Sequence, residues 1–312
     1  MKEIIKRIDS AKHIVVVAHI NPDADSLGSA SAMYTHLLRL HKKVSFFCAS
    51  KNINPKLSFI PWFEKIRNSF PSSADLAITL DCASLSRLGI EIDCDLINID
   101  HHKSNSQFAM YNLVDSLCIS TSQVLCNFFQ IHGISINKKM ATSLYAGLLD
   151  DSDGFMSDDV NGMVFATSNM LIESGADYKL CNKYIMKYQS LASLKLKATM
   201  LTNMSLFNDA KIALFLVSTE DMKKTGAIAE DCESALEEAL YLPTVELSIL
   251  LKENKNGTLK GSLRSCGDFD ALSIASKFNG GGHKSRSGFT MNSEYTLQSA
   301  SQEILKLVNK EI

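Results

Sequence analysis

The stretch IVVVAHINPDAD, residues 14–25, predicts how the N-terminal part of this 312-residue chain folds. Its first five residues, Ile14–Ala18, form an uninterrupted apolar and mostly β-branched run, which is typical of a strand buried on both faces of a parallel sheet. A polar loop follows, and residues 26–40, rich in Ala, Leu and Met, then predict a helix. Strand, loop and helix in this order form the first unit of a βαβ fold.

The alternation of strands and helices continues through the first half of the chain. Further strands are expected at 43–49, 76–80 and 96–99, and further helices at 2–10, 119–132 and 137–149. Such alternation predicts an α/β fold with a mostly parallel sheet and helices on both faces. In sheets of this kind ligands bind beyond the carboxyl ends of the strands, so the residues that follow each strand are candidates for a functional site.

A second set of elements predicts a smaller α/β domain in the C-terminal part. Before it, helices are expected at 163–173 and 177–200. The stretch 189–202 is interpreted as a helical linker between a first domain at 1–188 and a second at 203–312. The remaining strands are expected at 211–217, 245–251, 258–264 and 288–291, and helices at 271–278 and 297–309. The turn NKNG at 254–257 indicates a β-hairpin. The length of the chain also favours two domains.

Composition argues against several classes of protein. The net charge of −2 disfavours a surface for long duplex nucleic acid, whereas a small phosphorylated ligand held by a few local cations is compatible with it. The eight cysteines include no C-x-x-C pair, which indicates reduced thiols rather than disulfides or a structural zinc site. The N-terminal residues MKEIIKRI are too charged for a signal peptide, and no apolar run is long enough to span a bilayer. We therefore expect a cytoplasmic protein without a membrane partner.

Residues that can bind a metal ion follow three of the expected strands and one expected helix. They are His19, Asp23, Asp25, Asp81, Asp100, His101, His102, Asp150, Asp151 and Asp153. Imidazole and carboxylate ligands together suit Mn²⁺, Zn²⁺ or Fe²⁺. The set is large enough for two divalent ions that share a bridging Asp, an arrangement that clamps the attacking and leaving oxygens of a phosphoryl displacement.

Each of these segments also has a structural interpretation when taken alone. The aspartates of the first loop could cap the helix that follows, and Asp81 could cap a helix that starts near Ala83. The pair His101-His102 could form a solvated surface turn, and the acidic residues after 149 could simply end a helix. Negative charge at a helix C-terminus opposes the helix dipole, however, so a cation is expected there.

A second motif, GGGHKSR at 280–286, predicts an anion-binding loop. Glycines let backbone N–H groups approach an anion closely in a concave nest, and His283, Lys284 and Arg286 would add positive charge. Arg264, at the end of another expected strand, could fork onto a phosphate. The motif is neither a P-loop nor a dinucleotide-binding fingerprint, and a flexible Gly turn is the structural alternative.

These motifs together resemble a known family. H-x-N-P-D-x-D-S-x-G-S at 19–29, Asp81, Asp100-His101-His102 and Asp151 resemble the four motifs of the DHH phosphoesterase superfamily. GGGH at 280–283 resembles the signature of the DHHA1 domain. The order, spacing and total length resemble the nanoRNase/pAp phosphatase branch, often called NrnA.

The resemblance implies a role for each residue of the motifs. His19 and Asp23 would bind one ion, Asp25, His101 and Asp151 the other, and Asp81 both. The ions would be Mn²⁺ in the first place, with Mg²⁺ or Co²⁺ as alternatives. His102 would face the scissile phosphate with support from Asp100. The residues implied to hold the rest of the substrate are Arg264, Gly280, Gly281, Gly282, His283 and Ser285.

The function implied by the resemblance is hydrolysis of short RNA (nanoRNA) and of 3′-phosphoadenosine 5′-phosphate by a Mn²⁺-dependent enzyme. The DHHA1 domain would close over the DHH domain across a cleft, and a homodimer is compatible with the family. The alternatives are a cyclic-dinucleotide phosphodiesterase, a family II inorganic pyrophosphatase and a non-catalytic nucleotide-binding regulator. The chain departs from the family pattern at Ala24, Asn279 and 285–287, and the last two changes bear on substrate preference.

Overall fold

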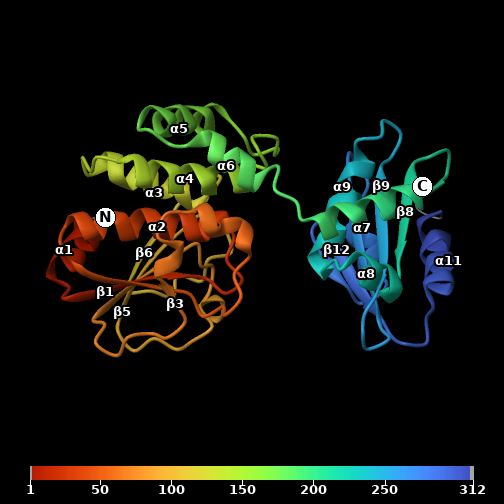
Figure 1. Cartoon of the computed structure of the whole chain (residues 1–312), viewed down its shortest axis with the longest axis horizontal. Coiled ribbons are helices and arrows are strands. Elements are labelled where there is room, and N and C mark those ends of the chain that lie inside the picture. Colours follow the sequence, from red (N-terminus) through yellow and green to blue (C-terminus); the bar gives the residue numbers. More distant parts are fainter. Residues whose placement is uncertain (1, 310–312) are drawn as a thin grey trace. The chain divides into compact units, whose positions relative to one another are not determined.

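The computed structural model describes residues 2–309 and divides the chain into two compact units, Met1–Tyr188 and Gln189–Ile312. Figure 1 shows that each unit contains its own sheet with helices packed against it, which confirms the α/β fold. Every helix within the described residues is too short or too polar to cross a lipid bilayer.

The first unit is built on a parallel sheet with β1 near its centre. Six strands of the described residues form it, in the order β3-β2-β1-β4-β5-β6, and every neighbouring pair is parallel. They are β1 (His13–Ala18), β2 (Lys43–Phe47), β3 (Ile66–Arg67), β4 (Leu76–Leu80), β5 (Asp95–Asp100) and β6 (Tyr111–Val114). The strand order reverses between β1 and β4, and parallel sheets bind ligands at such a switch point. His19, directly after β1, and Asp81, directly after β4, lie at this point.

The α-helices of the first unit cover one face of the sheet in layers, with α2 nearest the strands and α5 farthest from them (Figure 1). They are α1 (Lys2–Ser10), α2 (Ala24–Arg39), α3 (Thr121–Ile131), α4 (Lys138–Asp151), α5 (Gly162–Glu173) and α6 (Tyr178–Ile185). Alternate residues of a strand point to opposite faces, so Ile14 and Val16 pack among the helices. Val15 and Val17 pack instead against loops and the 3₁₀ turn η3 (Leu85–Leu88). The expectation of helices on both faces is therefore confirmed for one face only. Loops and η3 cover the other face.

Helices α2 and α4 approach each other closely through small residues. A Cβ at Gly28 of α2 would lie 2.3 Å from the carbonyl oxygen of Ser143 in α4. The hydroxyl groups of Ser31 and Ser143 lie 2.8 Å apart in the same contact. This contact brings the first turn of α2, with Asp25, towards the end of α4, with Asp151.

The segment 177–200 differs from the expected continuous helix. Helix α6 ends at Ile185, and α7 (Leu191–Thr202) begins after Ser190, whose side chain accepts a hydrogen bond from the backbone N–H of Ser193. This cap starts a new helix, and the boundary between the two units falls in the short segment before it. Leu196 of α7 packs in the core of the second unit, so the stretch expected as a linker belongs largely to that unit.

The second unit is built on a mixed sheet in the order β11-β12-β10-β9-β8-β7 within the described residues. Only β8 and β9 are parallel among its described pairs. Its strands are β7 (Ser205–Phe207), β8 (Ile212–Val217), β9 (Leu247–Glu253), β10 (Leu259–Ser265), β11 (Gly281–Gly282) and β12 (Arg286–Met291). The predicted hairpin at 254–257 joins β9 and β10, with Gly257 at φ +82°.

Helices pack on both faces of this second sheet. One core contains Ile274 and Ile304, from α10 and α11, and the other contains Leu196 and Leu236, from α7 and α9. Besides α7, this unit contains α8 (Thr219–Thr225), α9 (Glu233–Leu240), α10 (Ala271–Ser276) and α11 (Leu297–Val308). The other 3₁₀ turns are η1 (Pro55–Phe59), η2 (Phe63–Lys65) and η4 (Ala229–Cys232).

Candidate metal centre

The first group of potential ligands lies at the switch point of the sheet. His19 is buried at the end of β1, and its Nε2 lies 3.6 Å from Asp23 Oδ2 and 3.4 Å from Asp81 Oδ2. Nδ1 of His19 lies 2.8 Å from the carbonyl oxygen of Ile20, so it can donate there and leave Nε2 to accept a metal. Burial alone would lower the pKa of His19, but the nearby carboxylates of Asp23 and Asp81 outweigh it and raise the pKa to about 9. These carboxylates therefore favour a positive charge here.

The second group consists of Asp25, His101 and Asp151. His101 Nε2 lies 3.4 Å from Asp151 Oδ2. Asp25 is fully buried in the first turn of α2 and accepts hydrogen bonds from the backbone N–H groups of Thr121, at 2.6 Å, and Ser122, at 2.9 Å. Burial, helped by the charge of Asp81, raises the pKa of Asp25 to about 8. Burial and the neighbouring carboxylates raise the pKa of Asp151 well above its usual range.

Asp81 lies between the two groups. Its Oδ2 faces His19, whereas its Oδ1 lies 3.5 Å from His101 Nε2 and 3.6 Å from His102 Nδ1. Oδ1 also accepts a hydrogen bond from the hydroxyl of Thr121 at 2.9 Å. The backbone of Asp81 is held at φ +61°, a conformation that is costly for a residue with a Cβ and is concentrated at functional sites. This position suits the bridging role expected of Asp81.

The carboxylates that follow α4 differ in their surroundings. Asp151 faces His101, whereas Asp150 Oδ2 accepts a hydrogen bond from the backbone N–H of Ala24 at 3.0 Å. Asp153 is exposed, and no described residue groups it with the other candidate ligands. Among the three, the geometry therefore favours Asp151 as the ligand.

The structural alternatives for the aspartates are only partly realised. Asp23 Oδ1 caps α2 by accepting from Ser26 N–H at 2.9 Å, while its Oδ2 faces His19, so Asp23 serves both purposes. Asp81 does not cap the turn that follows it, because η3 begins after Ser84.

Asp100 and His102 form a buried support for the site. Asp100 is fully buried; its Oδ1 lies 2.8 Å from His102 Nδ1, and its Oδ2 accepts from Asn105 Nδ2 at 2.5 Å. Burial opposes ionisation of Asp100, but the hydrogen bonds with His102 and Asn105 outweigh it and lower the pKa. The same bond with Asp100 raises the pKa of His102, whose side chain is 42% exposed. His102 is thus held at Nδ1, which leaves Nε2 free for an anion.

Several residues at the site were not predicted from the sequence. Arg87, on η3, places its Nη2 3.0 Å from Nδ1 of His19, and nothing in its local sequence indicated this position. The backbone N–H groups at the start of α3 hold Asp25. The sequence Ser120-Thr121-Ser122 signals the start of a helix, but not which carboxylate the helix would face.

The donor set fits divalent metal ions. Among the described residues three overlapping groups bring one ligand atom from each member within 4.8 Å of one another. They are His19-Asp23-Asp81, Asp25-His101-Asp151 and Asp81-His101-His102. The facing histidine and aspartate atoms lie 3.4–3.6 Å apart, too far for good hydrogen bonds. Buried carboxylates with raised pKa values need a cation in place of lost solvation, and mixed imidazole and carboxylate ligands suit Mn²⁺ and related ions.

In the second unit the Gly motif forms part of a hairpin, and Gly280 and Gly281 line a hollow of about 450 Å³. Gly281 and Gly282 form β11, which pairs with β12, and the backbone N–H of His283 donates to the carbonyl oxygen of Arg286 at 2.8 Å. A Cβ at Gly280 would lie 2.3 Å from the carbonyl oxygen of Gly288. The glycines are therefore needed because the two backbone segments pack closely, and residues 281–286 lie exposed at the tip.

Arg264 lies on the strand next to this hairpin, and its side chain is already paired. It stands opposite Arg286 in the β10–β12 register, and its Nη2 contacts Glu233 Oε2 at 2.5 Å. Arg286 pairs in the same way with Glu237 at 2.9 Å. Burial lowers the pKa of Arg264, and Glu233 opposes this effect. The backbone carbonyl oxygen of Ser285 accepts a hydrogen bond from the backbone N–H of Ser265 at 2.9 Å, next to these arginines in the sequence.

Comparison with known proteins gives consistent results over nearly the whole chain. The N-terminal domain of the DHH family matches residues 13–148, and the DHHA1 domain matches residues 209–312. The bifunctional oligoribonuclease and PAP phosphatase NrnA of Thermus thermophilus is 25% identical over 99% of this chain and 93% of its own length. The cyclic-di-AMP phosphodiesterase GdpP of Bacillus subtilis is 24% identical over 91% of this chain, which spans 45% of that protein. The crystal structure of an exopolyphosphatase-related protein from Bacteroides fragilis is 26% identical, with a TM-score of 0.86 over 98% of this chain and 95% of that one.

Proposed function

This chain belongs to the DHH superfamily of hydrolases as an NrnA-like member, and from that premise we propose that it is a Mn²⁺-dependent phosphoesterase. Its proposed substrates are short oligoribonucleotides and 3′-phosphoadenosine 5′-phosphate. The observation that carries the proposal is the position of Asp81, whose two carboxylate oxygens face two different sets of potential ligands. A shared carboxylate of this kind suits two ions that act on one phosphoryl group.

Six side chains would hold the ions. One would be bound by His19 and Asp23, the other by Asp25, His101 and Asp151, and both by Asp81. Divalent ions bound here would stabilise negative charge on the phosphoryl oxygens and activate a water as the nucleophile.

The chain itself would supply a positioned hydrogen-bond donor. Asp100 accepts from Nδ1 of His102 and favours its protonated form, so Nε2 can donate to an oxygen of the scissile phosphate. Asn105 keeps Asp100 in place from the other side. Because these groups are fixed before substrate arrives, little reorganisation accompanies the reaction.

The second unit would bind a part of the substrate remote from the scissile bond. Its candidates are Arg264, Gly280, Gly281, Gly282, His283 and Ser285. Since Arg264 is paired with Glu233, a phosphate would have to compete with that carboxylate for the guanidinium. Arg264→Gln should therefore raise KM for both substrates and change kcat less.

A cyclic-dinucleotide phosphodiesterase is the second candidate, supported by the similarity to GdpP. Turnover of a ribodinucleotide, 3′-phosphoadenosine 5′-phosphate, cyclic di-AMP and pyrophosphate should be compared with Mn²⁺ present. The proposal predicts hydrolysis of the first two and loss of both activities in Asp81→Ala. Preferred hydrolysis of cyclic di-AMP would favour the second candidate, and undiminished turnover in Asp81→Ala would refute the two-metal site.

A further inference from the structure

A column of three aromatic rings lies in the first unit outside the metal centre. The ring centroids of Phe59 and Tyr184 are 5.0 Å apart with planes at 17°, and those of Tyr184 and Tyr188 are 5.7 Å apart at 15°. The three rings are thus nearly parallel. Phe59 belongs to η1 and Tyr184 to α6, while Tyr188 follows that helix and is 48% exposed. The stack therefore ends at an aromatic ring that is accessible to solvent.

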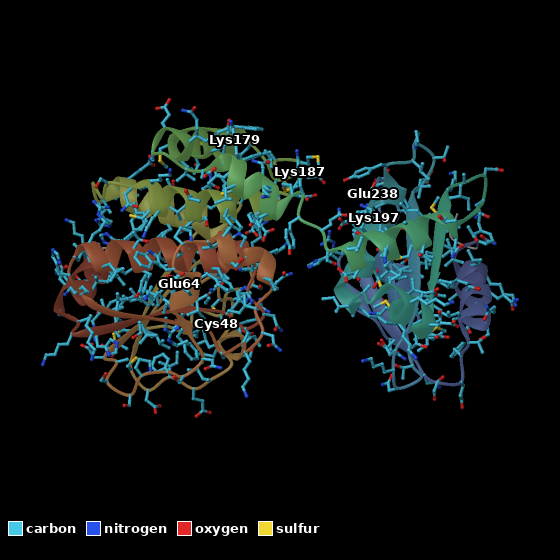
Figure 2. The ribbon with its side chains drawn as sticks, in the orientation of Figure 1. Cys48, Glu64, Lys179, Lys187, Lys197 and Glu238 are labelled. Carbon is cyan, nitrogen blue, oxygen red and sulfur yellow. The ribbon has the colours of Figure 1, made fainter. Side chains whose placement is uncertain are left out.

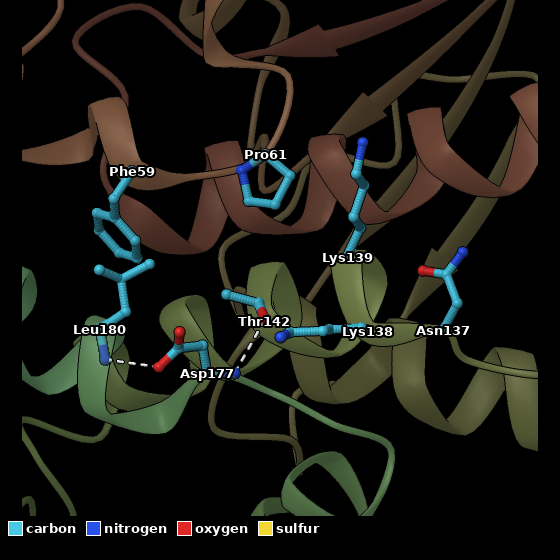
Figure 3. Close-up of a pocket in the computed structure, with 8 residues that line it drawn as sticks. All are labelled: Phe59, Pro61, Asn137, Lys138, Lys139, Thr142, Asp177 and Leu180. Atoms are coloured by element: carbon cyan, nitrogen blue, oxygen red, sulfur yellow. Dashed lines mark hydrogen bonds between the residues drawn. The ribbon is translucent and has the colours of Figure 1, made fainter.

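The column continues an apolar edge of α6. Leu180 and Tyr184 are four residues apart and lie on one side of the helix. Figure 3 shows Leu180 and Phe59 facing each other at one end of a hollow of about 550 Å³, which Pro61 also lines. Phe59 and Leu180 thus support the inner end of the column, and the outer ring of Tyr188 lacks a described aromatic partner beyond Tyr184.

Three lysines lie on α6 and just after it, near the aromatic rings in the sequence. Lys179, Lys183 and Lys187 also repeat every four residues, and all three are exposed (Figure 2 labels the first and the last). Within residues 2–309 none of the three takes part in an ion pair. The ammonium group of Lys183 lies 5.5 Å from the ring centroid of Tyr184. Unpaired positive charge is therefore concentrated beside the column, although the chain as a whole is slightly acidic.

The column also adjoins the end of α4 that carries Asp151. Met186, between the two tyrosines, packs against Gly154, where a Cβ would lie 2.7 Å from the methionine Cε. Lys56, from the same turn as Phe59, lies close enough to Asp150 of α4 for the two charges to interact. A ligand with one group in the metal centre could thus place another group at the column.

We propose that the column and the lysine stripe form a subsite for single-stranded RNA, in which a nucleobase stacks on Tyr188 and backbone phosphates contact Lys183 and Lys187. The inference rests on the proposed function, because it assigns this subsite to nucleotides beyond the one at the scissile phosphate. Proteins bind single strands by combining aromatic rings, on which any base stacks, with cations that follow the backbone. The arrangement explains how a chain with net charge −2 can hold an oligonucleotide.

Binding without turnover tests the subsite. The affinity of a fluorescently labelled tetraadenylate RNA is measured by anisotropy in EDTA for the full chain and its variants. Tyr188→Ala should weaken binding roughly tenfold or more, since stacking on one ring is removed. Tyr188→Phe should bind like the natural chain. Tyr178→Ala, at an exposed tyrosine of α6 outside the column, is the matched control and should also bind normally.

Two further comparisons sharpen the test. Tyr188→Ala should weaken binding of the tetranucleotide more than binding of 3′-phosphoadenosine 5′-phosphate, and replacing the three lysines by Gln should reduce the salt dependence of tetranucleotide binding. Normal tetranucleotide binding by Tyr188→Ala, an equal loss for both ligands or an equal loss in Tyr178→Ala would overturn the stacking subsite. An unchanged salt dependence would overturn the role of the lysines.

The subsite and the proposed function can fail separately. A chain that binds the tetranucleotide through Tyr188 in EDTA but does not hydrolyse it with Mn²⁺ would refute the proposed function and support the subsite. A chain that hydrolyses the tetranucleotide with the same KM before and after Tyr188→Ala would refute the subsite alone.

Discussion

The buried carboxylate of Asp25 occupies the space where a side chain at Gly147 would begin. A Cβ built on Gly147 would lie 2.4 Å from Asp25 Oδ1 and 2.8 Å from Asp25 Cα. Asp25 is a proposed metal ligand in α2, and Gly147 lies in α4 one turn before Asp151. The geometry of the metal centre therefore depends on a missing side chain in the helix contact behind it.

Gly147→Ala should displace Asp25 and weaken metal binding. The backbone of Asp25 must move as well as its carboxylate, and overpacking of this kind costs about 1–3 kcal/mol of stability. We expect a lower Tm, weaker Mn²⁺ binding by calorimetry and reduced turnover. Gly162→Ala is the matched control, because a Cβ there meets nothing within 4 Å. Unaltered Mn²⁺ affinity in Gly147→Ala would show that Asp25 is not held in place by this contact.

Asp151→Asn should have opposite effects on the metal-free and metal-bound protein. Burial and the charges of Asp25 and Asp81 raise the pKa of Asp151, so its ionised form destabilises the metal-free fold at neutral pH. The amide removes that cost, and Tm in EDTA should rise. Loss of a ligand should lower turnover by about 100-fold or more, since even residues that only support ligands contribute 10–100-fold.

The control for this prediction is Asp153→Asn in the same turn. Asp153 is exposed and outside the three ligand groups of the described residues. Melting curves with and without Mn²⁺, together with turnover, should therefore match those of the natural chain. A similar loss of activity in both variants would contradict the assignment of Asp151 over Asp153.

The sequence predicted the parts of the fold that have a strong local pattern. The apolar run at 76–80 coincides with β4, and a parallel sheet followed from the alternation of elements. Short elements such as β3 and β6 lack a pattern, because pairing with a neighbouring strand defines them and local sequence does not. The break after Ile185 was missed because the residues around it are compatible with a helix, and only the Ser190 cap and the separate packing of α7 end it.

The same distinction applies to the candidate site. Residues at the ends of β1, β4 and β5 could be grouped because parallel strands end at a common edge of the sheet. The position of Arg87 beside His19, and of the α3 N-terminus beside Asp25, depends on how loops and helices pack at long range. The pairing of Arg264 with Glu233 could not be foreseen either, because α9 was not among the expected helices.

His36 should make the fold sensitive to acid in a range that is independent of the metal centre. Its ring is buried against Phe129, and burial, with a contribution from Arg39, lowers its pKa to about 4. The unfolded chain binds the proton near pH 6.5, so the stabilisation is complete above that pH and is lost as pH falls towards 4. The loss should approach about 3 kcal/mol.

The contribution of His36 is isolated by comparison with His36→Gln. Urea unfolding in EDTA is measured from pH 7.5 to pH 4 for both proteins, and the difference between them removes the effects of the acidic residues. The free energy of unfolding of the natural chain should fall relative to the variant below pH 6.5. Parallel pH profiles would show that His36 titrates normally in the folded state.

Asp100→Asn should reduce turnover without removing a proposed metal ligand. Asp100 holds His102 at Nδ1 and raises its pKa, so the neutral amide should leave His102 less protonated and less well oriented. Supporting residues of this kind contribute about 10–100-fold, and we expect kcat to fall by that amount while Mn²⁺ affinity changes less. Because the pKa of His102 would fall, the alkaline loss of activity should move to lower pH. A large loss of Mn²⁺ affinity with an unshifted pH profile would instead assign Asp100 to the metal centre itself.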